Sequence, residues 1–116
     1  MNILKKNITV AKTSELLQTI ASPARLEILL AINTGEACVC HLEAILGYRQ
    51  AYISQHLMAL RKADIIESRR EGRYIYHRLR KPELLDVIQQ TASLTNFASL
   101  TLPILSEDCG CPKCIS

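Results

Sequence analysis

The chain has 116 residues, of which 48% are apolar, and its net charge is +3. This length suits a single domain with one core of modest size. The sequence lacks a run of about 18 apolar residues, which a membrane-spanning helix requires. Residues 1–6 also lack the long apolar stretch of a secretory signal. We therefore expect a cytoplasmic protein without a membrane partner.

Five cysteines form two groups. Cys38 and Cys40 lie near the first third of the chain, whereas Cys109, Cys111 and Cys114 lie close to its end. Because the cytoplasm keeps thiols reduced and an odd number cannot pair completely, a disulfide framework is not expected. The cysteines are more typical of metal ligands or redox centres.

Positive charge is concentrated in one part of the sequence. Residues 49–81 contain nine lysines and arginines against three acidic residues, whereas the remainder of the chain is net negative. A concentrated basic segment binds polyanions well, because neutralising each phosphate releases condensed counterions. The pattern favours a nucleic-acid partner, and a solvated basic surface is the alternative.

The first third of the chain predicts two helices. Apolar residues recur at helical spacing between residues 8 and 20. Ser22 is a favourable N-cap, and Pro23 suits the first helical position, where its missing N–H costs nothing. We expect the second helix to run from Pro23 to near Gly35.

Two further helices are separated by a glycine turn. Residues 38–46 predict a short helix that Gly47 ends in the manner of a C-terminal cap. In residues 50–63, three apolar side chains at i, i+4 and i+7 share one side of a helix: Ile53, Leu57 and Leu60. A short helix, a tight turn and a second amphipathic helix form the helix-turn-helix pattern, whose second helix enters the major groove.

A hairpin and a last helix follow. Residues 65–70 and 73–79 are rich in β-branched and aromatic side chains and flank Glu71-Gly72, which predicts a β-hairpin. Pro82 is expected to open the last helix, which ends or kinks near Pro103. The predicted fold class is mainly α with a β-hairpin wing, that is, a winged helix-turn-helix, and a second copy of the chain would add to its modest core.

Three segments resemble the ArsR/SmtB family of metal-responsive winged-helix repressors. They are residues 22–29, the Cys38-Val39-Cys40 segment with its flanks, and residues 54–61 followed by the wing at 69–73. The resemblance covers about residues 14–85. It implies a homodimer, held by the first and last helices, that binds a palindromic operator in double-stranded DNA and represses transcription until an inducer lowers its affinity. Residues 1–105 would form the DNA-binding and dimerisation domain, and residues 106–116 a cysteine-rich tail.

Eleven residues are predicted to contact DNA. Base edges suit the amide, hydroxyl and apolar side chains of the second helix of the motif, namely Gln50, Tyr52, Ser54, Gln55 and Met58. Phosphates, or the minor groove in the case of the wing, suit the basic side chains Arg49, Arg61, Lys62, Arg69, Arg70 and Arg73. Packing against a neighbouring helix is the alternative for Tyr52, and simple solvent exposure for Met58.

Three other aromatic residues are expected to serve the fold. His56 lies at the edge of the apolar side of its helix, which favours a core or capping role over base reading. Tyr74 and Tyr76 alternate with Ile75, and packing on the sheet is the simpler interpretation.

The Cys38-x-Cys40 pair looks like the third-helix site of the arsenic, cadmium and lead sensors of this family. The commonest arsenic form has a cysteine where this chain has Glu43 and an aspartate where it has His41, so other ligands are needed. An extended ten-residue tail spans up to about 33 Å, which brings its cysteines within reach. We predict a composite metal site formed by Cys38, Cys40, Cys109, Cys111 and Cys114.

Thiolate ligands select soft or thiophilic ions. Three sulfurs suit As(III) or Pb(II), and four suit Cd(II) or Zn(II), so any of these ions is a candidate inducer. His41 is a possible nitrogen ligand, with an ordinary surface histidine as the alternative. The other family site, built from histidines and carboxylates on the last helix, is not expected, because residues 83–102 contain no histidine.

The spacing of the two cysteines suggests a mechanism. Residues i and i+2 of a regular helix point about 200° apart. Cys38 and Cys40 are therefore expected to bind one ion only if the first turn of their helix is deformed. That deformation would be transmitted to the DNA-reading helix.

Three alternatives remain open. A repressor of the same fold can be switched by oxidation of Cys38, Cys40 or the tail thiols to disulfides or persulfides. The tail can hold a structural zinc ion without any sensing role. The C-P-x-C motif at residues 111–114 suggests a thiol oxidoreductase. In such enzymes the motif opens a helix, whereas here it lies in a tail, so we do not expect an enzyme.

Overall fold

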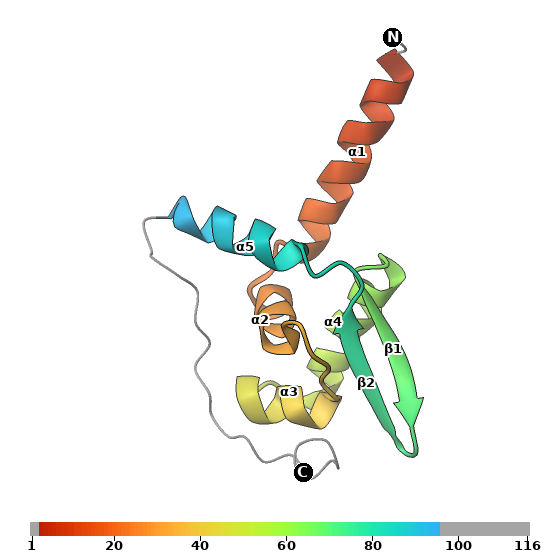
Figure 1. Ribbon diagram of the computed structural model, residues 1–116, viewed down its shortest axis with the longest axis vertical. Helices are drawn as coiled ribbons and strands as arrows, with labels where there is room; N and C mark the ends of the chain where they lie inside the picture. The colour runs from red at the N-terminus through yellow and green to blue at the C-terminus, as the bar shows by residue number, and fades with distance from the viewer. Residues whose placement is uncertain (1–2, 96–116) are drawn as a thin grey trace.

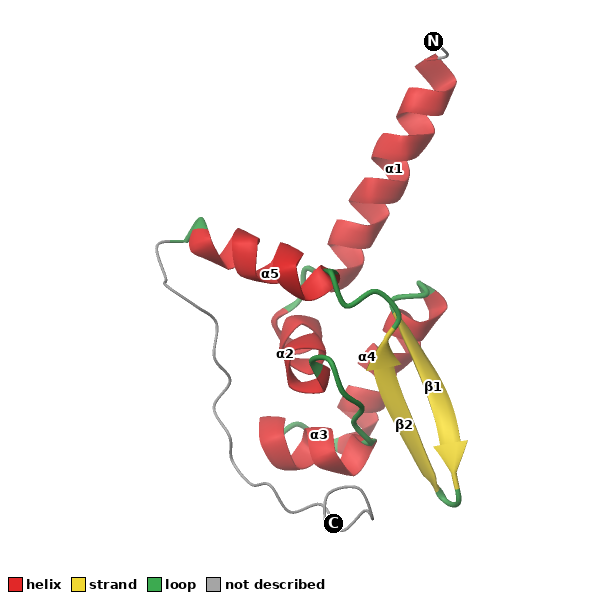
Figure 2. Cartoon of the chain, viewed as in Figure 1, coloured by secondary structure: helices red, strands yellow, loops and turns green. Residues whose placement is uncertain are grey.

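The computed structural model describes residues 3–95, and the side chains from residue 8 onward. Within residues 3–95, five helices and one hairpin follow one another, as Figures 1 and 2 show. In order, they are α1 (Ile3–Ile20), α2 (Pro23–Ile32), α3 (Val39–Leu46), α4 (Gln50–Lys62), β1 (Ile66–Glu71), β2 (Tyr74–Leu79) and α5 (Leu84–Ser93). Cys109, Cys111, Cys114 and Pro103 lie outside the described residues, as does the predicted domain boundary at residue 105.

The predicted elements are present, but several of their ends differ from the prediction. Helix α1 begins at Ile3, earlier than the apolar pattern indicated. Helix α2 ends at Ile32 because Asn33 leaves the helical conformation, with a φ of 54° and a ψ of −138°. Helix α5 begins at Leu84 rather than at Pro82, because the N–H of Leu84 bonds to the carbonyl of Lys81 in a preceding turn.

Helix α2 lies at the centre of the molecule and packs on α3, α4, α5 and the wing (Figure 1). Ser22 caps its first turn as predicted, with its Oγ accepting from the N–H of Arg25. Five residues of the core are 0% exposed: Ile28 and Leu29 of α2, Leu42 of α3, and Ile53 and Leu60 of α4. Burying a side chain of this size contributes about 1.5–3 kcal/mol. The core therefore fixes α4 against α2 and α3.

The wing is an antiparallel hairpin with Ile66 opposite Leu79 at its base and Glu71 opposite Tyr74 at its tip. Its turn is Gly72-Arg73, one residue later than predicted. Gly72 has a φ of 64°, as the first position of a two-residue hairpin turn requires. Ile66 and Leu79 are buried in the main core and attach the hairpin to it.

Helix α1 extends away from the rest of the molecule, and α5 lies across its base (Figure 1). Four large apolar side chains of α1 are between 40% and 61% exposed: Ile8, Val10, Leu16 and Leu17. An apolar groove of about 390 Å³ runs between α1 and α5, lined by Leu17, Ile20, Val87 and Ile88 among others. Within residues 3–95, no helix combines the length and apolar character that crossing a bilayer requires.

Candidate nucleic-acid interface and thiol site

The turn between α3 and α4 is fixed by two contacts. Gly47 adopts a left-handed conformation with a φ of 79°, and its N–H donates to the carbonyl of Glu43 at 2.8 Å. The hydroxyl of Tyr48 donates to the carboxylate of Glu27 on α2. This hydrogen bond, together with burial, raises the pKa of Tyr48 to about 12. The start of α4 is therefore tied to the central helix.

Helix α4 has one buried side and one exposed side. Ile53, Leu57 and Leu60 are buried. The predicted DNA-contacting residues of this region are exposed, with the exception of the partly buried Ser54: Arg49, Gln50, Tyr52, Gln55, Met58, Arg61 and Lys62. The structure thus brings these side chains to one side of the second helix of the motif.

His56 serves packing, in agreement with the sequence-based interpretation. Its Nδ1 accepts a hydrogen bond from Nε of Arg25 at 3.0 Å, and Nη1 of Arg25 donates to the carbonyl of Thr19 at 2.9 Å. Among the described residues, its buried Nε2 has no partner. Burial, and then the charge of Arg25, lower the pKa of His56. The ring of Tyr52 packs edge-on against His56 at 4.5 Å between centroids, so Tyr52 is partly packed and 44% exposed.

The basic residues of the wing differ in their surroundings. Arg70 and Arg73 are exposed near its tip. Arg69 is also exposed, by 46%, but contacts within the chain hold its side chain: its Nε and Nη2 donate to Glu36 at 2.7 and 2.8 Å and its Nη1 to Glu71 at 3.2 Å. The hydrogen bond to Glu36 is the main reason why the pKa of Arg69 is raised. Arg69 therefore faces the cysteine segment in this conformation.

The two thiols lie side by side. Their Sγ atoms are 2.8 Å apart, and Cys38 is only 3% exposed. The expectation that the cysteines point apart is wrong, because Cys38 precedes α3 as its N-cap in an extended conformation, with a φ of −89° and a ψ of 167°. Both sulfurs can thus face one ion while α3 remains a regular helix.

The thiol pair packs on the wing. Cys38 and Tyr76 form a buried cluster of their own, and Cys40 and Tyr74 pack against it. Tyr74 and Tyr76 thus pack as expected for sheet residues, and they also contact the cysteines. Nothing in the sequence pattern pointed to this contact, because it joins residues more than thirty positions apart.

The described part of the chain brings together two of the predicted metal ligands, Cys38 and Cys40. Between residues 3 and 95, no three His, Cys, Asp or Glu side chains gather as metal ligands would. His41 is partly buried in the first turn of α3. Two adjacent thiols are ligands that a soft ion prefers.

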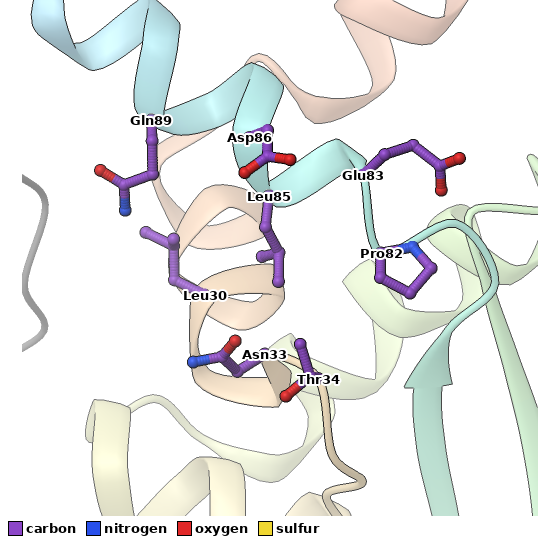
Figure 3. Close-up of a pocket in the computed structure, with 8 residues that line it drawn as sticks. All are labelled: Leu30, Asn33, Thr34, Pro82, Glu83, Leu85, Asp86 and Gln89. Carbon is purple, nitrogen blue, oxygen red and sulfur yellow. The ribbon is translucent and has the colours of Figure 1, made fainter.

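A polar pocket of about 650 Å³ lies between the end of α2 and the start of α5. Figure 3 shows Asp86 and Gln89 of α5 facing Asn33 and Thr34 at the end of α2. Among the described residues, its lining includes the carboxylates of Glu83 and Asp86 but no histidine. It therefore lacks the histidine that a site of the last-helix type requires.

Helices α2, α3 and α4 with the hairpin define a winged helix-turn-helix protein. Residues 22–68 match the family model described as a bacterial regulatory protein of the arsR family. The chain belongs to the ArsR/SmtB family of regulators. Membership of a family of transcriptional regulators argues against the thiol oxidoreductase alternative.

Three known proteins illustrate the similarity. The biofilm growth-associated repressor of Agrobacterium fabrum is 42% identical over 74 residues, which are 64% of this chain and 63% of that protein. The arsenical resistance operon repressor of Staphylococcus xylosus is 31% identical over 98 residues, covering 84% of this chain and 86% of that protein. The crystal structure of the transcriptional regulator HlyU from Vibrio vulnificus superposes with a TM-score of 0.68 at 33% identity, covering 81% of this chain and 98% of that one. For several other curated relatives, the match spans less than two thirds of the relative's own length.

Proposed function

We propose that the protein is a transcriptional repressor that binds operator DNA as a homodimer and is released when a thiophilic ion binds Cys38 and Cys40. The observation that carries this proposal is the 2.8 Å separation of the two sulfurs beside the helix-turn-helix motif. The Agrobacterium and Staphylococcus relatives are both named repressors, which supports the assignment of repression.

Binding to DNA follows from the exposed side of α4 and the wing. Gln50 and Gln55 carry amides that can hydrogen-bond an adenine edge in the major groove. Arg49, Arg61 and Lys62 flank them with positive charge suited to phosphates. Arg70 and Arg73 extend this charge along the wing.

The homodimer is supported by the apolar surface of α1 and α5. Leu16 and Leu17 of α1 and Val87 of α5 are 40–48% exposed in the single chain, although monomeric proteins rarely leave large contiguous apolar patches uncovered. Pairing these helices across two copies would cover the surface and present two copies of α4 to a palindrome. A monomer mass in sedimentation equilibrium at micromolar concentration would argue against this arrangement.

The inducer is a soft or thiophilic ion bound by thiolates. Two thiolates and one further sulfur suit arsenite or lead, and two further sulfurs suit cadmium or zinc. Cys109, Cys111 and Cys114 are the remaining cysteines of the chain, and we propose that they complete the site. The name of the Staphylococcus relative, an arsenical resistance operon repressor, makes arsenite the first ion to test.

The test is operator binding by the reduced protein, with and without arsenite, cadmium, lead and zinc. We expect one ion to raise the operator dissociation constant by about 5- to 150-fold, the usual range of coupling between two sites. The Cys38→Ser/Cys40→Ser variant should show no such change, and the Cys109→Ser/Cys111→Ser/Cys114→Ser variant a smaller one. Full release retained by the first variant would overturn the proposal.

The same separation of the sulfurs favours a second candidate function, a repressor switched by oxidation. Two thiols at 2.8 Å can give up two protons and two electrons to an oxidant such as a peroxide and form a disulfide. Operator release by hydrogen peroxide in the presence of a chelator, with the loss of two hydrogens in the mass spectrum, would favour this function over metal sensing.

A further inference from the structure

The segment that carries the thiols is joined to the wing by its backbone. The N–H of Ala37 donates to the carbonyl of His77 at 3.0 Å, and the N–H of His77 donates to the carbonyl of Ala37 at 2.8 Å. These two bonds form an antiparallel bridge to β2. The residue next to Cys38 is thus paired with the wing, and Figure 1 shows the start of α3 beside β2.

A second link is an ion pair. Both carboxylate oxygens of Glu36 accept from the guanidinium of Arg69 on β1, at 2.7 and 2.8 Å. Such a two-point contact fixes orientation as well as distance. The side chain of Glu36 is only 14% exposed, so the pair is partly shielded from water. This pair attaches strand β1 to Glu36, which lies two residues before Cys38 in the sequence.

The third link is a buried aromatic ring. Tyr76 of β2 is 2% exposed and packs on Cys38, with Cys40 against the same cluster. The same ring has a second partner. The guanidinium of Arg69 lies 5.0 Å from the centre of the Tyr76 ring, within the range of a cation–π contact. Tyr76 therefore connects the sulfurs to the same arginine that Glu36 holds.

Ligand capture has to disturb these links. Binding an ion to Cys38 brings the ion and its other ligands against a sulfur that is only 3% exposed. A buried sulfur cannot take on a bonded ion in a close-packed environment without moving its neighbours. The neighbour of Cys38 in this cluster is Tyr76.

We infer that the wing is the element that the thiol pair moves, and that Glu36, Arg69 and Tyr76 are the positioning residues that carry the movement. Displacement of Cys38 shifts Tyr76 and the Glu36–Arg69 pair, and the hairpin moves its exposed arginines away from their DNA contacts. Helix α3 stays regular, since Cys38 precedes it. This inference rests on the proposed function and replaces the deformation of α3 as the route from ligand to DNA.

The test compares two ion pairs to arginines of the wing, of which only one lies beside the thiols. Glu36→Gln breaks the pair with Arg69, and Glu67→Gln breaks the more exposed pair that Glu67 forms with Arg78 near the base of the hairpin. Each variant removes one negative charge near the DNA, so any general gain in operator affinity should be similar in both. The quantity to compare is the ratio of operator dissociation constants with and without arsenite or cadmium.

We expect the Glu67→Gln ratio to equal that of the wild type and the Glu36→Gln ratio to fall at least threefold below it. Ion affinity without DNA, followed by the absorbance of the metal–thiolate bonds, should be the same in all three proteins. Equal ratios for the two variants would overturn this inference and leave the proposed function standing. Loss of ion binding in Glu36→Gln would also overturn it, because Glu36 would then belong to the ion site. A wild-type ratio of one with the ion bound would overturn the proposed function itself.

Discussion

Cys38 occupies a position that helices usually give to Ser, Thr, Asp or Asn. An N-cap of that kind accepts a hydrogen bond from the first turn and contributes about 1 kcal/mol. Cys38 makes no side-chain cap hydrogen bond, so α3 forgoes this stability. A residue that breaks a local rule of stability is a candidate for function. Its place before the helix is also what turns its sulfur toward Cys40.

His56 gives the protein a stability that depends on pH. Burial and the nearby Arg25 hold its pKa below the ordinary value of 6.5. At a pH well above 6.5, the imidazole of His56 is neutral in both the folded and the unfolded chain. As the pH falls below 6.5, the unfolded chain binds the proton first, so the free energy of unfolding decreases, by at most about 1.4 kcal/mol per pH unit for one group.

The His56→Gln variant isolates this contribution. A glutamine carbonyl oxygen can accept from Nε of Arg25 but does not titrate. We expect the fall in melting temperature between pH 7.5 and pH 5.5 to be smaller in His56→Gln than in the wild type. A residual fall should remain, because burial also lowers the pKa of His77. An unchanged fall in the variant would show that His56 does not carry the effect.

At the scale of elements, the sequence predicts those with a clear period or cap. The apolar spacing in α4, Gly47 after α3 and Ser22 before α2 are local signals, and the structure confirms them. The early start of α1 at Ile3 was not predicted. Contacts between distant segments, such as Glu36 with Arg69, leave no periodic trace. For the same reason the paired thiols and their packing on the wing could not be predicted.

The turn between α3 and α4 depends on the conformation of one glycine. Gly47 has a φ of 79°, which costs a residue with a side chain about 1–2 kcal/mol. We expect Gly47→Ala to lower the free energy of unfolding by about that amount, measured by urea denaturation, and to weaken operator binding because α4 begins three residues later. Gly35→Ala is the matched control, since an added Cβ there would meet only the carbonyl of Ile32 at 3.9 Å. Equal losses in the two variants would contradict this account of the turn.

On the scale of the whole molecule, the described chain separates three tasks in space. Helices α1 and α5 carry the exposed apolar surface, and α4 with the wing carries the basic surface. The thiol pair lies between α3 and the wing, buried against Tyr76. In this arrangement the proposed sensor contacts the wing. Ion binding at the thiols and operator binding can therefore oppose each other through one small rearrangement.

In the proposed mechanism, occupation of the thiol pair and binding of the operator oppose each other. Thermodynamic linkage requires the two effects to be equal, whatever path connects the sites. The most direct measurement is therefore the affinity of the protein for arsenite, and in parallel for cadmium, with and without saturating operator. We predict that the operator weakens ion binding by the same factor by which that ion weakens operator binding. Equal ion affinity for the free and the operator-bound protein would contradict the account.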